Sequence, residues 1–225
     1  MSDMSETTSS SNVVDYLLNA IGDGTFNPGE KLPPERDLST QLSVSRNTVR
    51  EAIKVMNYLG FIDSTQGSGN YIANAYDHAV SSIMKVLYMR NEISFLNVTD
   101  FRRMLELQSF ELAITHATPG QKLEMRNAVN QLDSCTDPAQ IVTLDNRFHT
   151  ILAEASHNKL IVIIYVALSK VIDEYMRETY LRVTKHAQGF AELQTYHHAI
   201  VDALFEKDAE KGRQAIIDHF NLLIR

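Results

Sequence analysis

Cysteine, tryptophan and long apolar runs are scarce in this sequence of 225 residues, which holds one cysteine, Cys135, and no tryptophan. A single thiol forms neither an internal disulfide nor a thiolate-rich metal site, so disulfide scaffolds and zinc fingers are excluded. No apolar stretch approaches the roughly 18 residues that a membrane-spanning helix needs. Residues 1–12 are rich in serine and threonine and lack the basic and apolar segments of a signal peptide. We therefore expect a disordered tail there, and a cytoplasmic protein without a membrane partner.

Basic residues are also few: 21 lysines and arginines stand against 28 aspartates and glutamates, which gives a formal net charge of −7. This balance argues against a protein that coats nucleic acid through general positive charge, but it does not exclude a local basic face. Five bases occur in the first 75 residues, and four of the five fall between residues 36 and 54. Whether these four basic residues form a DNA-binding face depends on the secondary structure in which they lie.

Turn residues divide the chain into two parts. Six of the nine glycines lie between residues 22 and 69, whereas from about residue 76 long apolar-periodic stretches alternate with short polar breaks. The second pattern is typical of a helical bundle. We therefore expect a mainly α protein, with a first domain over residues 13–74 and an all-helical second domain over residues 75–225. The helices of the second domain are predicted at about 76–90, 98–116, 119–133, 138–156, 158–183, 187–206 and 208–224.

The first domain has the pattern of three helices and a hairpin. Ser45 is the predicted N-cap of the third helix, and Gly67 and Gly69 lie at the tip of the hairpin, where glycine adopts the backbone conformations that a tight turn requires. Three helices followed by a hairpin form a winged helix-turn-helix. The predicted elements are helices over 13–22, from about 34, and over 46–60, and strands at 61–64 and 70–73.

The third helix has polar residues early and on one side, opposite an apolar stripe that runs from Val49 to Leu59. A recognition helix presents donors to base edges and phosphates in this way while its other face packs on the domain. The alternative is a set of solvated helix charges, but the hairpin that follows favours DNA reading. The polar residues are Arg46, Asn47, Thr48, Arg50 and Lys54.

Residues 26–73 resemble the DNA-binding domain of GntR-family transcription regulators. The resemblance rests on the segments 28–38, 44–52, 60–62 and 67–69. It implies that Arg36, Arg46 and Arg50 contact phosphates and guanines of double-stranded operator DNA, with Ser45, Asn47 and Thr48 beside them and Gly67 near the minor groove. In the family, the wing often carries arginine or histidine where this chain has Thr65 and Gln66. We therefore expect the wing of this protein to bind DNA more weakly or with a different selectivity.

Histidines of the second domain occupy faces that are otherwise apolar. Asp145 and His149 are four residues apart and share one helical face, and His197 and His219 lie on apolar faces of two other helices. Three convergent imidazoles and a carboxylate can hold a cation, but core histidines that each bond to a neighbour remain the alternative. His198 competes with His197 for the third histidine position.

Residues 76–225 are similar to the all-helical FCD ligand-binding domain of the FadR subfamily of GntR regulators. The similarity rests on Arg102 with residues 105–106, and on segments around 145–149, 155–158, 197–203 and 215–219. It implies a divalent ion held by Asp145, His149, His197 and His219, and it favours His197 over His198, because His197 stands at the family's histidine position. Nitrogen and oxygen ligands without thiolate suit zinc, nickel or manganese.

The sequence therefore predicts a dimeric, ligand-responsive regulator that reads a pseudo-palindromic operator, represses a catabolic operon and senses a small organic acid at the metal. Arg102 is expected to bind the effector carboxylate, or alternatively to form an exposed ion pair with Glu106. Other hypotheses are a metal-free acyl-CoA sensor of the same fold and a metal-dependent hydrolase fused to a DNA-binding module. We expect no enzyme, because the sequence contains no nucleophile motif of a known hydrolase class.

Overall fold

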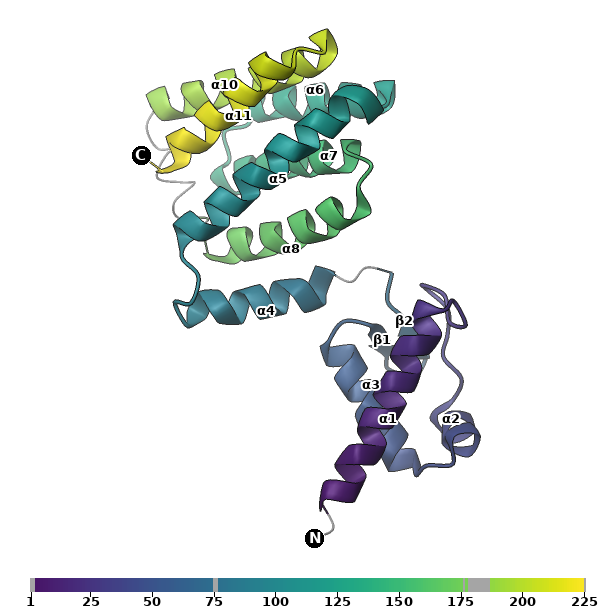
Figure 1. Cartoon of the computed structure of the whole chain (residues 1–225). Helices are drawn as coiled ribbons and strands as arrows, with labels where there is room; N and C mark the ends of the chain where they lie inside the picture. Colours follow the sequence, from purple (N-terminus) through teal and green to yellow (C-terminus); the bar gives the residue numbers. More distant parts are fainter. Residues whose placement is uncertain (1–2, 75–76, 176, 178–186, 225) are drawn as a thin grey trace. The chain divides into compact units, whose positions relative to one another are not determined.

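The computed structural model describes residues 3–74, 77–175, 177 and 187–224 (Figure 1). The protein is mainly α-helical with one small two-stranded sheet, as the sequence predicts. The chain divides into two compact units, Met1–Val80 and Ser81–Arg225. No helix in the described part of the chain combines the length and the apolar character needed to cross a membrane.

The first unit is a winged helix-turn-helix with its own core. Val13 and Leu17 of the first helix pack on Val49 and Met56 of the third, and Ile72 of the hairpin closes the cluster. The apolar stripe predicted from residue 49 onward is therefore the buried face of the third helix. The elements are α1 (Asp3–Gly22), α2 (Glu35–Leu42), α3 (Arg46–Tyr58), β1 (Ile62–Thr65) and β2 (Gly69–Ile72).

Two boundaries of this unit differ from those predicted. The first helix begins at Asp3, where the composition predicts a disordered tail over residues 1–12; once a helix is nucleated, its extension costs little. The unit ends at Val80 instead of near Asn74. His78 lies against Gly60, where an added Cβ would come within 3.0 Å of the His78 Cβ. The start of the next helix therefore packs with the first unit.

The hairpin forms in the predicted place. β1 and β2 are antiparallel, with Ile62 opposite Ile72 and Thr65 opposite Gly69. Gly67 and Gly69 have φ values of 77° and 121°, so both occupy backbone conformations that favour glycine. The backbone of Leu32 donates to the Asn70 carbonyl (2.8 Å), which ties the hairpin to the segment that leads into α2.

The second unit is a helical bundle. Local signals set where several helices begin: Ser94 and Thr118 form capping boxes, and Asp137 caps a helix that opens with Pro138. The Ser94 cap explains why its helix begins at residue 95 and not at about 98 as predicted. The helices are α4 (Asp77–Met89), α5 (Phe95–His116), α6 (Pro119–Ser134), α7 (Pro138–Ala155), α8 (Lys159–Tyr175), α10 (Ala187–Glu206) and α11 (Ala209–Ile224).

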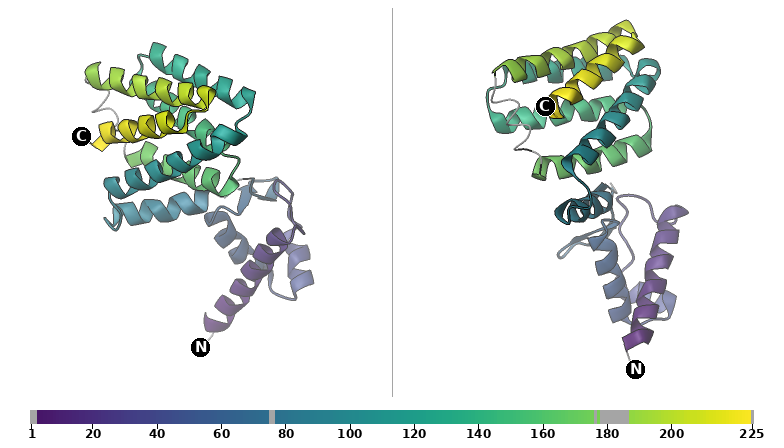
Figure 2. Two further views of the ribbon diagram at one scale, coloured as in Figure 1. Left: turned by 45° about the horizontal axis from the view of Figure 1, so that its top comes forward. Right: turned by 60° about the vertical axis from the view of Figure 1, so that its left-hand side comes forward.

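The helix predicted over 158–183 is described only to Tyr175, and residues 176 and 178–183 of that prediction lie outside the described residues. Helix α5 lies against α7, α8 and α11, and α10 pairs with α11 (Figures 1 and 2). The core between them is built around Phe110, Phe148 and Phe220. Helix α11 approaches α5 closely at Gly212, where an added Cβ would lie 2.0 Å from Phe110 Cζ. Side chains of α5, α7, α10 and α11 share this core.

Candidate functional site

The start of α3 is the candidate DNA interface. Ser45 caps the helix, because its Oγ accepts a hydrogen bond from the Thr48 backbone (3.1 Å). The two hydroxyls also share a hydrogen bond of 2.8 Å, and Thr48 is buried. Thr48 thus contributes to the helix start, whereas the other residues predicted to contact DNA are exposed. The exposed ones are Arg36, Ser45, Arg46, Asn47, Arg50 and Gly67.

An ion pair links α2 to α3 at this interface. Arg50 Nε donates to Glu35 Oε2 (3.2 Å), and Arg50 Nη2 forms an ion pair with the same oxygen at 3.1 Å. Two guanidinium nitrogens next to one carboxylate fix the direction of the side chain better than a single contact does. Arg36 instead pairs with its neighbour Asp37 (3.1 Å). Of the predicted base-reading arginines, Arg50 is therefore held in a defined orientation by a residue of another helix.

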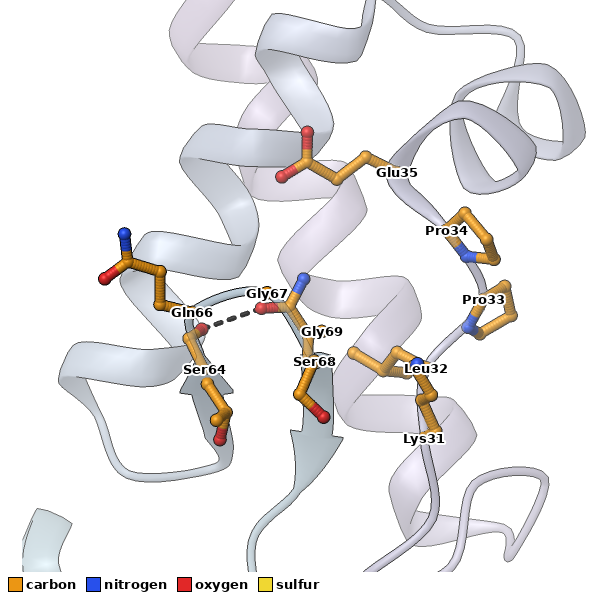
Figure 3. Close-up of a pocket in the computed structure, with 12 residues that line it drawn as sticks. Lys31, Leu32, Pro33, Pro34, Glu35, Ser64, Gln66, Gly67, Ser68 and Gly69 are labelled. Carbon is orange, nitrogen blue, oxygen red and sulfur yellow. Dashed lines mark hydrogen bonds between the residues drawn. The ribbon is translucent and has the colours of Figure 1, made fainter.

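A cleft separates the hairpin from the segment Lys31–Glu35 (Figure 3). Ser64 Oγ donates to Asn70 Oδ1 across the hairpin (2.7 Å), which stiffens the turn that carries Gly67. The side chain of Lys31 passes Gly69 so closely that an added Cβ would lie 2.8 Å from Lys31 Cε. These contacts hold the wing beside the start of α2, so both belong to one surface.

The second unit contains a buried cluster of four potential metal ligands from three helices. Asp145 and His149 come from α7, His197 from α10 and His219 from α11, and none is more than 3% exposed. The Nε2 atom of His197 lies 3.3 Å from His149 Nε2, 3.1 Å from His219 Nε2 and 3.2 Å from Asp145 Oδ1. All four ligand atoms lie within 4.8 Å of one another.

These side chains fit a divalent ion. Ligand atoms bound to one ion at about 2.0–2.2 Å lie roughly 3 Å apart, close to the separations measured here. Without a cation or a proton between them, the lone pairs of neighbouring Nε2 atoms would repel in a dry interior. His198 instead turns toward Asp133 at the surface, 2.7 Å from Nε2 to Oδ2. The geometry therefore brings together His197, and not His198, with the other three residues.

A buried hydrogen-bond network contacts His149 at Nδ1, the ring nitrogen that does not face the other ligands. His149 Nδ1 lies 2.7 Å from Glu106 Oε2, and Glu106 Oε1 accepts from Arg102 Nε (2.8 Å) and from the Tyr165 hydroxyl (3.1 Å). Arg102 Nε also donates to the Tyr165 oxygen (2.8 Å). The Arg102–Glu106 ion pair considered from the sequence therefore exists, but it is buried and not exposed. Among the described residues, no partner meets Arg102 Nη2.

Sequence reasoning missed Glu106 and Tyr165 as members of this site. The four-residue spacing of Arg102 and Glu106 indicated only an ion pair on one helix face. No feature of the sequence connects Tyr165 with Glu106, because the two residues are 59 positions apart and meet only where α5 packs on α8.

Burial and charge act differently on the three imidazoles. Burial lowers the pKa of His197 and of His219, and the neighbouring His149 lowers that of His219 further. Burial is the largest effect on His149 and opposes its charge, but the Glu106 and Asp145 carboxylates together outweigh it and raise the His149 pKa. Burial would raise the pKa of Asp145 and Glu106, yet it is outweighed in both. His149 and His197 together lower the pKa of Asp145, and His149 and Arg102 together lower that of Glu106. Two neutral imidazoles and an ionised Asp145 suit a cation, with which a proton on His149 competes.

Two protein-family models match the chain. One is described as "FCD domain" and covers residues 97–222; the other is described as "Bacterial regulatory proteins, gntR family" and covers residues 9–72. The chain belongs to the FCD-domain regulators of the gntR family. The FCD match covers more than half of the sequence and includes all four residues of the buried cluster, and the gntR match covers the winged helix-turn-helix.

Relatives of similar length support this membership. The "Putative L-lactate dehydrogenase operon regulatory protein" of Escherichia coli (strain K12) is 29% identical over 95% of this chain and 84% of its own. The "HTH-type transcriptional regulator LutR" of Bacillus subtilis (strain 168) is 24% identical over 88% of this chain and 92% of its own. The solved structure "Streptococcus agalactiae GntR" has a TM-score of 0.75, at 23% identity over 95% of this chain and 97% of that one, and shares the fold. FCD-domain regulators of the gntR family bind DNA to control transcription, so DNA binding and transcription regulation are the functions that this membership gives.

Proposed function

We propose that this protein is a homodimeric repressor of the FadR subfamily that reads a pseudo-palindromic operator and responds to a small organic acid bound at a divalent metal ion. The observation that carries the proposal is the convergence of Asp145, His149, His197 and His219 inside the FCD domain. A buried set of three imidazoles and a carboxylate has no role in a simple apolar core.

The DNA-reading residues divide by what their positions allow. Arg46, Asn47 and Arg50 are exposed on α3 and would read base edges in the major groove. Arg36 and the Ser45 hydroxyl would contact phosphates, and Gly67 would bring the wing backbone near the minor groove. Thr48 acts by holding the start of α3, because its hydroxyl bonds to Ser45. Two such units in a dimer read two half-sites.

The metal site would bind the ion through His149, His197 and His219 Nε2 atoms and an Asp145 oxygen. Zinc, nickel and manganese all accept such ligands, and a bound ion would supply a Lewis acid to which an effector carboxylate can coordinate. Arg102 Nη2 is buried, cationic and without a partner among the described residues, so it is suited to the second contact with a carboxylate. Effector binding would then favour one arrangement of the helices over another.

The names of relatives agree with this assignment. One relative is named as a putative regulatory protein of an L-lactate dehydrogenase operon, and lactate is a small hydroxy acid. We therefore propose a small carboxylate as effector and a neighbouring catabolic operon as target. A metal-free acyl-CoA sensor would leave the four convergent ligands without a purpose, and a hydrolase is disfavoured by the membership among transcription regulators.

Alanine variants of the metal ligands test the proposal. His149→Ala and His219→Ala should lose bound metal and the thermal shift given by small carboxylates. Operator binding should be retained, because the winged-helix unit has a core of its own. His198→Ala is the matched control, because it changes a histidine outside the cluster. Metal content by mass spectrometry and operator binding by fluorescence anisotropy give the two readouts. Absence of a divalent ion from metal-supplemented wild-type protein would overturn the metal-dependent mechanism.

A further inference from the structure

Resting on the proposed function, we propose that Glu106 is the positioning residue of the metal site: it holds His149 in the tautomer that leaves Nε2 free for the ion. Glu106 lies on α5, outside the three helices that carry the ligands. We therefore assign Glu106 a role in orienting a ligand in the metal-free protein, and not in binding the metal itself.

The distance from His149 Nδ1 to Glu106 Oε2 is 2.7 Å. An ionised carboxylate only accepts hydrogen bonds, so the imidazole must donate from Nδ1. A neutral imidazole carries a single N–H, and its other nitrogen then holds a lone pair. In His149 that nitrogen is Nε2, which faces His197 Nε2 at 3.3 Å. The Glu106 contact thus directs the lone pair of His149 into the cluster.

Glu106 is itself held in place. Arg102 Nε and the Tyr165 hydroxyl both donate to Oε1, at 2.8 Å and 3.1 Å, so Oε2 remains available to His149. Glu106 is fully buried, and Arg102 is only 5% exposed. Water therefore does not compete for these hydrogen bonds, and the two carboxylate oxygens have separate tasks.

The other two histidines differ from His149 in this respect. The Nδ1 atoms of His197 and His219 are buried, and neither has a hydrogen-bond partner among the described residues. Neither Nδ1 is therefore held by a carboxylate as His149 Nδ1 is by Glu106; the Asp145 carboxylate faces His197 at Nε2 instead, at 3.2 Å. With Asp145 one helical turn away on α7, His149 therefore forms the pre-organised half of the ligand set, and His197 and His219 complete it.

Charge acts in the same direction as geometry. The negative charge of Glu106 lies behind His149 and offsets the positive charge of Arg102. Replacement by glutamine removes that offset and leaves the buried guanidinium facing a dication. Loss of a supporting partner of this kind costs about 10- to 100-fold in metal affinity. We expect Glu106→Gln to weaken metal binding by this factor.

Two measurements test the proposal. The first is the tautomer of His149 in metal-free wild-type protein, read from nitrogen-15 chemical shifts of the imidazoles at alkaline pH, where the ring is neutral. Protonation at Nδ1 is expected, and protonation at Nε2 would overturn the proposal. This measurement needs no variant.

The second measurement is the affinity for zinc alone, by competition with a chromophoric chelator, in wild type, Glu106→Gln and the matched control Glu111→Gln. Glu111 lies on the same helix but pairs with Arg213 at the surface. Only Glu106→Gln should lose affinity. If the single variant is too unstable to purify, Arg102→Met with Glu106→Gln removes both buried charges and should also bind zinc more weakly than wild type.

The outcomes separate this inference from the proposed function. Zinc binding by wild type that is unchanged in the Glu106 variants would overturn the role of Glu106 while the metal-dependent regulator stands. Failure of wild type to bind any divalent ion would overturn the proposed function instead.

Discussion

Two arginine–glutamate pairs illustrate how environment decides what a side chain can do. Arg50 and Glu35 retain 55% and 30% of their side-chain exposure, whereas Arg102 and Glu106 retain 6% and 1%. An exposed pair contributes about 0–1 kcal/mol, so Arg50 can exchange Glu35 for DNA at little cost. A buried charge that loses its partner costs about 3–5 kcal/mol. The first pair is suited to recognition, and the second to holding a site together.

Glu35→Gln should reduce operator specificity while it strengthens non-specific DNA binding. The variant removes a negative charge beside Arg50 and frees the guanidinium to reach phosphates. The ratio of operator to non-specific affinity should fall by up to about tenfold, since an oriented arginine discriminates by about 1–3 kcal/mol. Anisotropy titrations at several salt concentrations measure both terms. Glu51→Gln, which removes the partner of Lys54 on the same helix, is the control; an equal fall of the ratio in both variants would contradict the argument.

Metal-induced stabilisation should increase with pH through the titration of His149. The Glu106 and Asp145 carboxylates together raise the pKa of His149 against the larger effect of burial. Its proton therefore stabilises the metal-free fold, and this stabilisation is fully present below the unfolded pKa of 6.5. That contribution is lost as pH rises through the folded pKa, and Nε2 becomes free for the ion. The difference in Tm between zinc-loaded and chelator-treated protein should therefore grow between about pH 6 and about pH 8.5. A constant or shrinking difference would contradict this view.

At the scale of elements, local signals determine where helices begin, and close packing determines how they meet. Ser94 and Thr118 start their helices through capping boxes that the chain carries in consecutive residues. The approach of α11 to α5 at Gly212 depends instead on residues about a hundred positions apart. Since α5 carries Arg102 and Glu106 and α11 carries His219, this contact sets the distance between the network and a metal ligand.

Gly212→Ala should destabilise the second unit although alanine favours helices. The added Cβ would lie 2.0 Å from Phe110 Cζ, and overpacking of this kind costs about 1–3 kcal/mol, more than the gain of about 1 kcal/mol in helix propensity. Urea denaturation measures the loss. Gly120→Ala is the control, because its nearest neighbour, Thr118 Oγ1, is 3.9 Å away. Phe110→Leu combined with Gly212→Ala should recover part of the stability; a neutral Gly212→Ala would show that the two helices can separate freely.

At the scale of the whole molecule, each unit has a hydrophobic core of its own. One core gathers α1, α2, α3 and the hairpin, and the other gathers the helices that surround Phe110 and Phe148. The first unit can therefore fold apart from the second. It carries more acids than bases, so a single copy has little general affinity for DNA.

A fragment of residues 1–80 should bind operator DNA about 100-fold more weakly than the full chain, or weaker still. In the proposed dimer, the second unit links two reading heads, which raises the effective concentration of the second head. Anisotropy at matched salt compares the two, with circular dichroism as the check that the fragment is folded. Fusion of the fragment to a dimeric coiled coil should restore affinity. Equal binding by the fragment and the full chain would contradict the dimer argument.

Much of the fold follows from the sequence because its causes are local. Apolar periodicity, capping residues and glycines at turns act over a few positions, and they indicated the winged helix-turn-helix, the hairpin and the order of helices in the bundle. The length of α1 was missed, since residues 3–12 have no apolar periodicity in the sequence, and the extent of α8 beyond Tyr175 lies outside the described residues.

The sequence by itself determined the chemistry that is available: an exposed polar face on α3, a carboxylate and a histidine one turn apart on α7, and further histidines on apolar faces. Tertiary structure alone decided that the Arg102–Glu106 pair is buried and that Glu106 and Tyr165 meet beside His149 Nδ1. It also brings His197, which the family resemblance favours, into the cluster and turns His198 toward Asp133. The physical reason is that side-chain identity is carried along the chain, whereas burial and hydrogen-bond partners depend on how helices distant in sequence pack against one another.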